Sequence, residues 1–202
     1  MENKIKEIKP VHLYIAGVTI FFIAIILSYF RIGQFYMSIS EFGADVRAAF
    51  VFNFLVFIAG IVTLIGCIQL CRENFKKYGR IRSIFLIMCT AALSFIALFP
   101  LGISQYVRGV HHVFSFILFI GMPICMILFS TLFYKVNQTI FLVLSVLGVL
   151  DIIQIIVFYN NGQEQLYQWL GVLITLVFIF ILLKFSPSLH EIKDEFEDLE
   201  WF

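Results

Sequence analysis

The stretch AAFVFNFLVFIAGIVTLIGCIQLC, residues 48–71, contains no lysine, arginine, aspartate or glutamate and is bounded by Arg47 and Arg72. An α-helix needs roughly 20 apolar residues to cross the hydrocarbon core of a bilayer, and this stretch is long enough. Inside the bilayer no water can bind an open backbone, so a helix is the expected form. The segment therefore predicts a transmembrane helix.

The same pattern recurs along the chain, with short polar segments between the apolar ones. The predicted spans are residues 13–30, 48–71, 83–99, 109–134, 136–159 and 165–183. Transmembrane barrels would instead require alternating segments of about 10 residues, which the sequence does not contain. The prediction is an all-α integral membrane protein, with a six-helix bundle in residues 1–185 and a short tail in residues 186–202.

The composition supports this class and argues against others. Hydrophobic residues make up 61% of the chain and charged residues only 13%, too few for the surface of a soluble domain of 202 residues. The net charge of +1 comes without the basic stripe that nucleic-acid binding requires. We expect an integral membrane protein that has membrane lipid, and not nucleic acid, as its partner.

The basic residues predict the orientation. Three arginines fall on one side of the predicted bundle: Arg31, Arg47 and Arg108. The other lysines and arginines fall on the side of the termini: Lys4, Lys6, Lys9, Arg72, Lys76, Lys77, Arg80, Arg82, Lys135, Lys184 and Lys193. Because cytoplasmic loops are enriched in lysine and arginine, both termini are predicted to be cytoplasmic.

Polar residues continue from the outer loops into the predicted helices. Asn53 lies six residues after Arg47, about 9 Å along a helix, and Asp151 lies eight residues before Tyr159, about 12 Å by the same rise. These depths predict an outward-facing polar cavity between the helices. The candidate ligand-binding residues are Arg47, Asn53, Arg108, His111, His112, Asp151, Gln154 and Gln168.

Asp151 is the most informative of these residues. A carboxylate inside the bilayer costs about 2.5 to 3.5 kcal/mol on insertion scales, so its side chain should not face lipid. We expect it to pair with a nearby arginine or histidine, or to remain protonated against Asn53 or Gln154. Three roles stay open at this point: structure, ligand binding, and proton transfer or catalysis.

No metal or other cofactor is predicted. His111 and His112 are adjacent, so on a helix their rings project about 100° apart and cannot readily hold one metal ion. Cys67 and Cys71 lack the further ligands of a zinc site and are interpreted as packing residues. The histidines and Asp151 are suitable for acid-base chemistry, but no catalytic motif accompanies them, so the sequence leaves the enzyme question open.

Several short motifs resemble a known family. They are Ser38-Ile-Ser-Glu-Phe-Gly-Ala, Val51-Phe-Asn53, Phe99-Pro100, His111-His112 with Ser115, and Tyr167-Gln168-Trp169-Leu170-Gly171. Together they resemble the prokaryotic six-span membrane family called domain of unknown function 998. They are also distantly similar to the six-span group of autophagy modulators and GPI-anchor remodelling factors. The first resemblance implies the six-span topology and a location in a prokaryotic cell membrane, and the second favours a function that involves lipids.

Three functions remain as hypotheses. The first is the binding or the processing of a lipid or another amphiphile in the outer cavity. The second is a small transporter or proton-coupled channel that uses Asp151. The third is a membrane scaffold, which would form a homo-oligomer or bind a protein partner through the acidic tail. The tail spaces Leu189, Ile192, Phe196 and Leu199 as an amphipathic helix.

Overall fold

The computed structural model describes residues 8–33, 38–75, 80–101 and 103–186, which form helices and no strand. The helices are α1 (Pro10–Ile32), α2 (Ile39–Phe42), α3 (Ala49–Asn74), α4 (Arg80–Leu98), α5 (Gln105–Phe133), α6 (Gln138–Asn160) and α7 (Glu164–Phe185). All of them except α2 are long and apolar enough to cross a membrane, which confirms the all-α, six-span prediction. The predicted amphipathic tail lies outside the described residues from residue 187 onward and stays a prediction.

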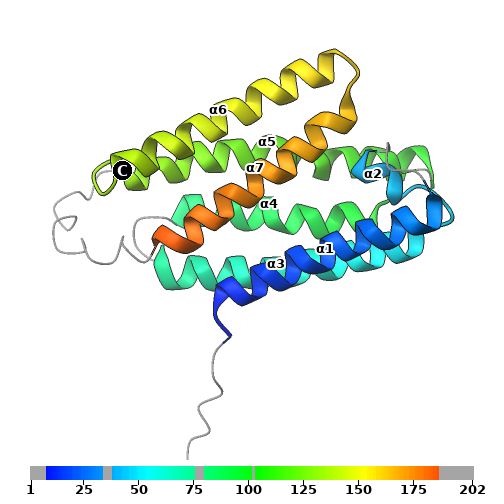
Figure 1. Ribbon diagram of the computed structural model, residues 1–202, viewed down its shortest axis with the longest axis horizontal. Helices are drawn as coiled ribbons and strands as arrows, with labels where there is room; N and C mark the ends of the chain where they lie inside the picture. Colours follow the sequence, from blue (N-terminus) through cyan, green and yellow to red (C-terminus); the bar gives the residue numbers. More distant parts are fainter. Residues whose placement is uncertain (1–7, 34–37, 76–79, 102, 187–202) are drawn as a thin grey trace, which may run out of the picture.

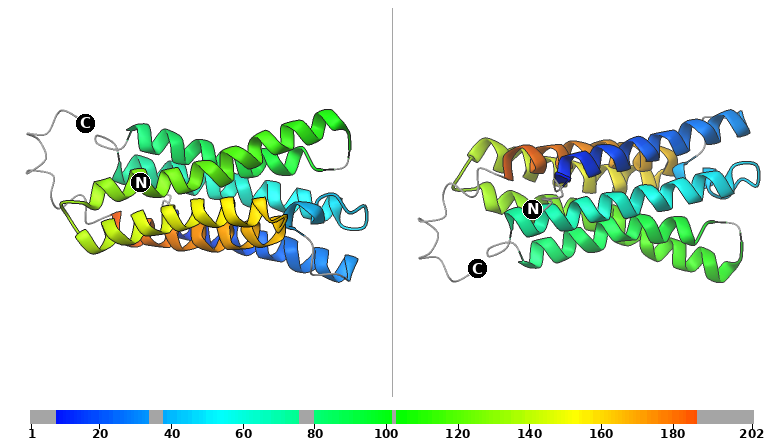
Figure 2. Two further views of the ribbon diagram at one scale, coloured as in Figure 1. Left: turned by 90° about the horizontal axis from the view of Figure 1, so that it is seen from above. Right: turned by 90° about the horizontal axis from the view of Figure 1, so that it is seen from below.

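The long helices form a ring (Figure 1). In this ring α1 packs on α3, α3 on α4, α4 on α5, α5 on α6, and α6 on α7. Figure 2 shows α1, α7 and α6 in one layer and α3, α4 and α5 in the other. The remaining seam, between α1 and α7, has few close backbone contacts. The ring is therefore least tightly closed at this seam.

Small residues bring α1 and α3 close together. A Cβ atom added at Gly17 would lie 3.1 Å from the carbonyl oxygen of Ala59 and would collide with the side chain of Thr63. The Thr63 hydroxyl donates to the Ala59 carbonyl oxygen at 2.7 Å, so its hydrogen bond is formed within α3. The sequence spacing of Ala59 and Thr63 predicts a close approach of a neighbouring backbone, and the structure confirms it.

A second close approach joins α5 and α6. Pro123 lies inside α5, as the sequence predicts. A Cβ atom at Gly148 of α6 would come within 2.8 Å of the Pro123 carbonyl oxygen and 3.2 Å of the Met126 Cβ atom. Only glycine fits there without a shift of the backbone, so this side of the ring is closed tightly.

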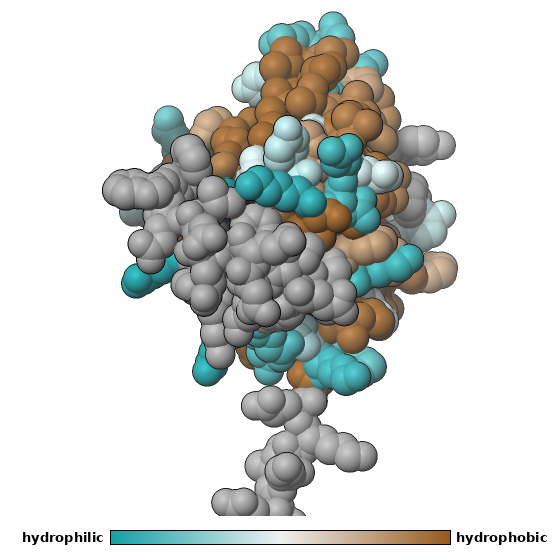
Figure 3. All heavy atoms as spheres, turned by 90° about the vertical axis from the view of Figure 1, so that its left-hand side faces the viewer, coloured by the Kyte–Doolittle hydropathy of each residue, from teal (hydrophilic) through white to brown (hydrophobic). Residues whose placement is uncertain are grey.

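Charge differs between the two ends of the ring. Helix α1 begins and α7 ends at the same end (Figure 1), and Figure 3, which looks onto this end, shows hydrophilic side chains there. Its exposed basic residues are Lys9, Arg72, Arg80, Lys135 and Lys184. The opposite end, called the α2 end below, carries Arg31, Arg47 and Arg108. This distribution agrees with the charge pattern of the sequence, and the cytoplasmic location of the termini stays a prediction.

Candidate functional site: two adjoining cavities

A cavity of about 100 Å³ with a partly polar lining lies at the α2 end, among α2, α3, α4, α5 and α7 and beside Phe21 of α1. A single water needs only about 10 to 15 Å³ by such a measure, so a larger group fits. The lining residues that can form hydrogen bonds are Ser40, Asn53, His111, His112, Ser115, Tyr167 and Gln168. Of the residues predicted from the sequence, the structure thus brings together Asn53, His111, His112 and Gln168.

The short helix α2 forms one wall of this α2-end cavity. Its local sequence begins with a capping box, in which the backbone N–H of Ser38 donates to Oε2 of Glu41 at 2.9 Å. Phe42 at its end is fully buried, and its ring stacks on that of Phe52 with centroids 5.7 Å apart. The cap starts α2 and the buried ring anchors it against α3.

Two of the predicted site residues hold α2 in place. Nδ2 of Asn53 donates to the Gly43 carbonyl oxygen at 2.9 Å. Gln168, only 6% exposed, accepts from the Ser40 backbone N–H at 3.3 Å, and its Nε2 donates to Oγ of Ser40 at 3.4 Å. Asn53 from α3 and Gln168 from α7 therefore position the wall of the cavity as well as line it.

The two histidines occupy different environments. His111 is 3% exposed, and its Nδ1 lies 2.8 Å from the carbonyl oxygen of Phe99. Because a carbonyl oxygen only accepts, we assign the proton to Nδ1, which leaves Nε2 as an acceptor. His112 is exposed, and its ring lies at 86° to that of His111. Among the described residues, no group of three or more histidines, cysteines or acids could hold a metal ion.

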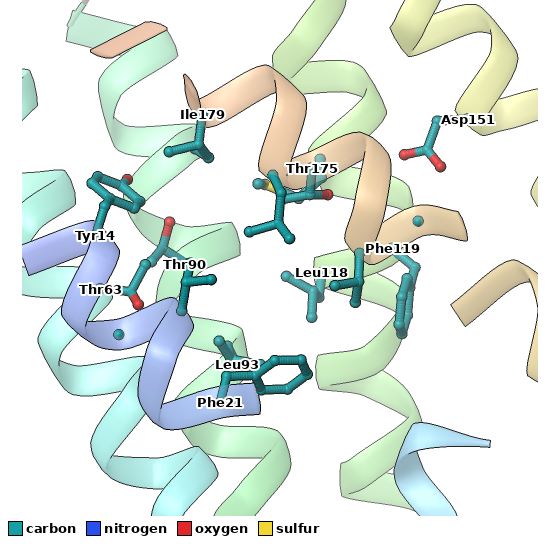
Figure 4. Close-up of a pocket in the computed structure, with 16 residues that line it drawn as sticks. Tyr14, Phe21, Thr63, Thr90, Leu93, Leu118, Phe119, Asp151, Thr175 and Ile179 are labelled. Carbon is teal, nitrogen blue, oxygen red and sulfur yellow. The ribbon is translucent and has the colours of Figure 1, made fainter. Parts of the chain in front are cut away.

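A second cavity of about 110 Å³, called the central cavity, lies inside the ring and is lined by residues of all the long helices, most of them from α1 and α7 (Figure 4). Its lining is largely apolar, with Asp151 and four hydroxyl-bearing residues as the polar exceptions: Tyr14, Thr63, Thr90 and Thr175. Figure 4 shows Asp151 on the α6 side and Tyr14 and Thr63 on the opposite side. A Cβ atom at Gly171 of α7 would lie 3.7 Å from Oδ1 of Asp151, so the carboxyl group lies close to the backbone of α7.

Of the partners that the sequence predicts for Asp151, the structure places Gln154 beside it. It is 2% exposed and does not face lipid. Nε2 of Gln154 donates to its Oδ1 at 2.8 Å and approaches the Tyr167 carbonyl oxygen at 3.4 Å. No basic side chain of the described residues forms an ion pair with Asp151. The partner of this carboxyl group is therefore a neutral amide and not a cation.

The remaining predicted residues, Arg47, Arg108 and Gln154, line neither of these cavities. Arg47 is paired with Asp45, with 2.7 Å between Nη2 and Oδ2, and it also donates to the Ile32 carbonyl oxygen at 3.2 Å. These hydrogen bonds from Arg47 lower the pKa of the Asp45 carboxyl group to about 2. Arg108 is exposed at the start of α5. A contact between either arginine and a headgroup stays a prediction.

The two cavities adjoin each other. Five residues line both of them: Phe21, Leu93, Leu118, Phe119 and Val172. Sequence reasoning placed Asp151 in a cavity but missed these five shared residues and the division into two cavities, because apolar residues that line a cavity have no pattern distinct from those that pack. It also missed α2 as a helix, although the Ser38-x-x-Glu41 capping box was a usable signal.

Six membrane-length helices around two internal cavities define a multi-pass integral membrane protein. Residues 14–183 match the model of the family described as Protein of unknown function (DUF998), and the chain belongs to this family. No curated protein and no solved structure matches the chain.

Proposed function

We propose that this membrane protein binds one amphiphile, of the lipid class, with its polar headgroup in the α2-end cavity and its hydrocarbon chain in the central cavity. The observation that carries this proposal is the shared lining by Phe21, Leu118, Phe119 and their neighbours. A cavity whose lining includes seven polar residues and an almost wholly apolar cavity that share one wall are complementary to a molecule with one polar and one apolar part.

The lining supports this division of the ligand. Amides, hydroxyls and imidazoles line the α2-end cavity, and these groups replace the hydrogen bonds that a headgroup loses when it leaves water. The central cavity offers mostly hydrocarbon, and each methylene group buried there contributes about 0.8 kcal/mol relative to water. A lipid arrives from the bilayer and not from water, so the headgroup contacts supply the specificity.

The seam between α1 and α7 provides a route from the bilayer. Both helices line both cavities, through Phe21 of α1 and Val172 of α7 among others. Because the backbones of α1 and α7 make few close contacts, side-chain movement alone opens more space here than at Gly17 or Gly148, where backbones touch. We expect an acyl chain to enter sideways through this seam.

A matched pair of substitutions on α7 tests the proposal. Thr175 lines the central cavity, whereas Leu173, two residues away, is 57% exposed and does not line it. The experiment is native mass spectrometry of gently purified wild type, Thr175→Phe and Leu173→Phe. We expect retained lipid in wild type and in Leu173→Phe, and its loss in Thr175→Phe. Equal retention in both variants, or no retained lipid in wild type, would overturn the proposal.

A second candidate is proton-coupled transport, which one observation favours: Asp151 is an acid that is almost fully buried in the membrane region and lines a cavity. This reading predicts proton flux in liposomes that disappears in Asp151→Asn, while the same substitution leaves lipid retention intact. Flux that is absent in wild type removes this candidate.

A further inference from the structure

We infer that the headgroup bound in the α2-end cavity is uncharged and carries hydroxyl groups, as in diacylglycerols and glycosyl diacylglycerols, and is not a phosphate ester. This inference rests on the proposed amphiphile site and specifies the class of its ligand.

The first argument is charge. No lysine, arginine, aspartate or glutamate is among the described residues that line the α2-end cavity. Phosphate esters are recognised by charge-assisted hydrogen bonds, most often from arginine or lysine. Arg47 is engaged by Asp45 at 2.7 Å, and Arg108 does not line the cavity. An anionic headgroup inside this cavity would lose its hydration without gaining a cation, which is unfavourable.

The second argument is the hydrogen-bonding capacity that the protein leaves unused. His111 uses Nδ1 on the Phe99 carbonyl oxygen, and with the proton on Nδ1 its Nε2 can accept a hydrogen bond. A phosphodiester has no donor, whereas a hydroxyl group has one. Asn53 and Gln168 each spend one amide N–H on the α2 segment and keep the other. A hydroxyl group both donates and accepts, so it can satisfy all three side chains.

The third argument concerns the position of the headgroup. The α2-end cavity and the central cavity share five lining residues, so we expect a hydroxylated headgroup bound in the first to remain attached to a chain that passes between these side chains into the second. A free polyol would use only the first chamber. The same hydrogen-bonding chemistry therefore has two sources, a lipid headgroup and a soluble polyol, and the length of the bound molecule distinguishes them.

The experiment measures binding of four probes to the full chain in detergent by native mass spectrometry: dioleoylglycerol, dioleoyl phosphatidylglycerol, dioleoyl phosphatidylcholine and free glycerol. The three lipids share their acyl chains, so differences between them report the headgroup. We expect dioleoylglycerol to bind at least about tenfold more tightly than either phospholipid. Equal or tighter binding of phosphatidylglycerol overturns this inference and leaves the amphiphile site standing.

Two other outcomes address the proposed function itself. If none of the lipids binds, or if free glycerol competes as well as dioleoylglycerol, the amphiphile site is wrong and the inference falls with it.

A pair of variants then reports the charge of the cavity directly. His112 is exposed and lines the cavity, so Arg and Gln both fit there. We expect His112→Arg, but not His112→Gln, to shift the preference toward phosphatidylglycerol, and an unchanged preference contradicts the inference.

Discussion

Gln154 donates a 2.8 Å hydrogen bond from Nε2 to Oδ1 of Asp151, three residues earlier on α6. Residues three apart on a helix lie on the same face, so the pair forms within one helix and needs no second element. It gives a carboxyl group in the membrane region a neutral hydrogen-bond partner, where burial makes an unpaired charge costly.

This relationship predicts the effect of two substitutions at Asp151. Asp151→Asn keeps an oxygen that accepts from Gln154, so we expect the free energy of unfolding to change by less than about 1 kcal/mol. Asp151→Leu leaves the buried amide without this acceptor and should cost about 1 to 3 kcal/mol. Denaturant unfolding in detergent measures both. A larger loss for Asp151→Asn than for Asp151→Leu would show that the negative charge itself stabilises the fold.

Glycine substitutions test the tight side of the ring. Gly148→Ala places its Cβ 2.8 Å from a backbone oxygen of α5, so we expect a loss of about 1 to 3 kcal/mol in the free energy of unfolding. The control is Gly109→Ala on α5, where nothing lies within 4 Å. Alanine favours a helix over glycine by about 1 kcal/mol, so the control should be neutral or stabilising. If the two variants unfold alike, the close α5–α6 packing is wrong.

The six helices could be predicted from the sequence because charge is so costly in a bilayer that its absence marks each span. The exact ends of the helices could not be predicted in this way, because a helix continues beyond the hydrocarbon core. Helix α5 begins at Gln105, four residues before the predicted span at 109, because Ser104 caps it by accepting from the Val107 N–H at 3.2 Å.

The candidate site was only partly predictable. The sequence places Asn53, His111 and Gln168 among the residues of one outward-facing cavity, and the structure finds these three in one cavity. Asp151 lines the other cavity, and its depth in the sequence did not reveal this. The division between the two cavities depends on how α7 packs across α6 at Gly171. Such packing follows from the tertiary arrangement and leaves no periodic signal in the chain.

The anchoring of α2 gives a third prediction. Gln168→Leu removes the acceptor of the Ser40 backbone N–H, so we expect faster hydrogen exchange at the amides of residues 38–42. Gln165→Leu, at an exposed position of the same helix, should leave this exchange unchanged. Hydrogen exchange with mass spectrometry reads out the segment. Unchanged exchange in Gln168→Leu would mean that Phe42 alone anchors α2.

A fourth prediction concerns pH at the α2 end. Arg47 lowers the pKa of Asp45 from 3.8 to about 2 in the folded protein. Because the folded pKa is the lower one, this pair stabilises the fold above pH 3.8, and its contribution is lost as the pH falls toward about 2. We expect Arg47→Ala to return the Asp45 pKa toward 3.8, as measured by NMR titration of its carboxyl group.

The control for this titration is Arg31→Ala. Arg31 contacts the Arg47 carbonyl oxygen at 3.4 Å and makes no described ion pair with Asp45. Its removal should leave the Asp45 pKa near 2. If both variants shift the pKa equally, the general charge of the loop and not the Asp45–Arg47 pair is responsible.

The central claim is that one amphiphile spans both cavities, and a structure of the wild-type protein in lipid nanodiscs tests it most directly. We expect continuous elongated density that begins beside Gln168 and His112, passes Phe119 and Leu118, and ends between α1 and α7 near Thr175. Lipid density confined to the outer surface of the ring, with water or collapsed side chains in both cavities, would contradict the claim.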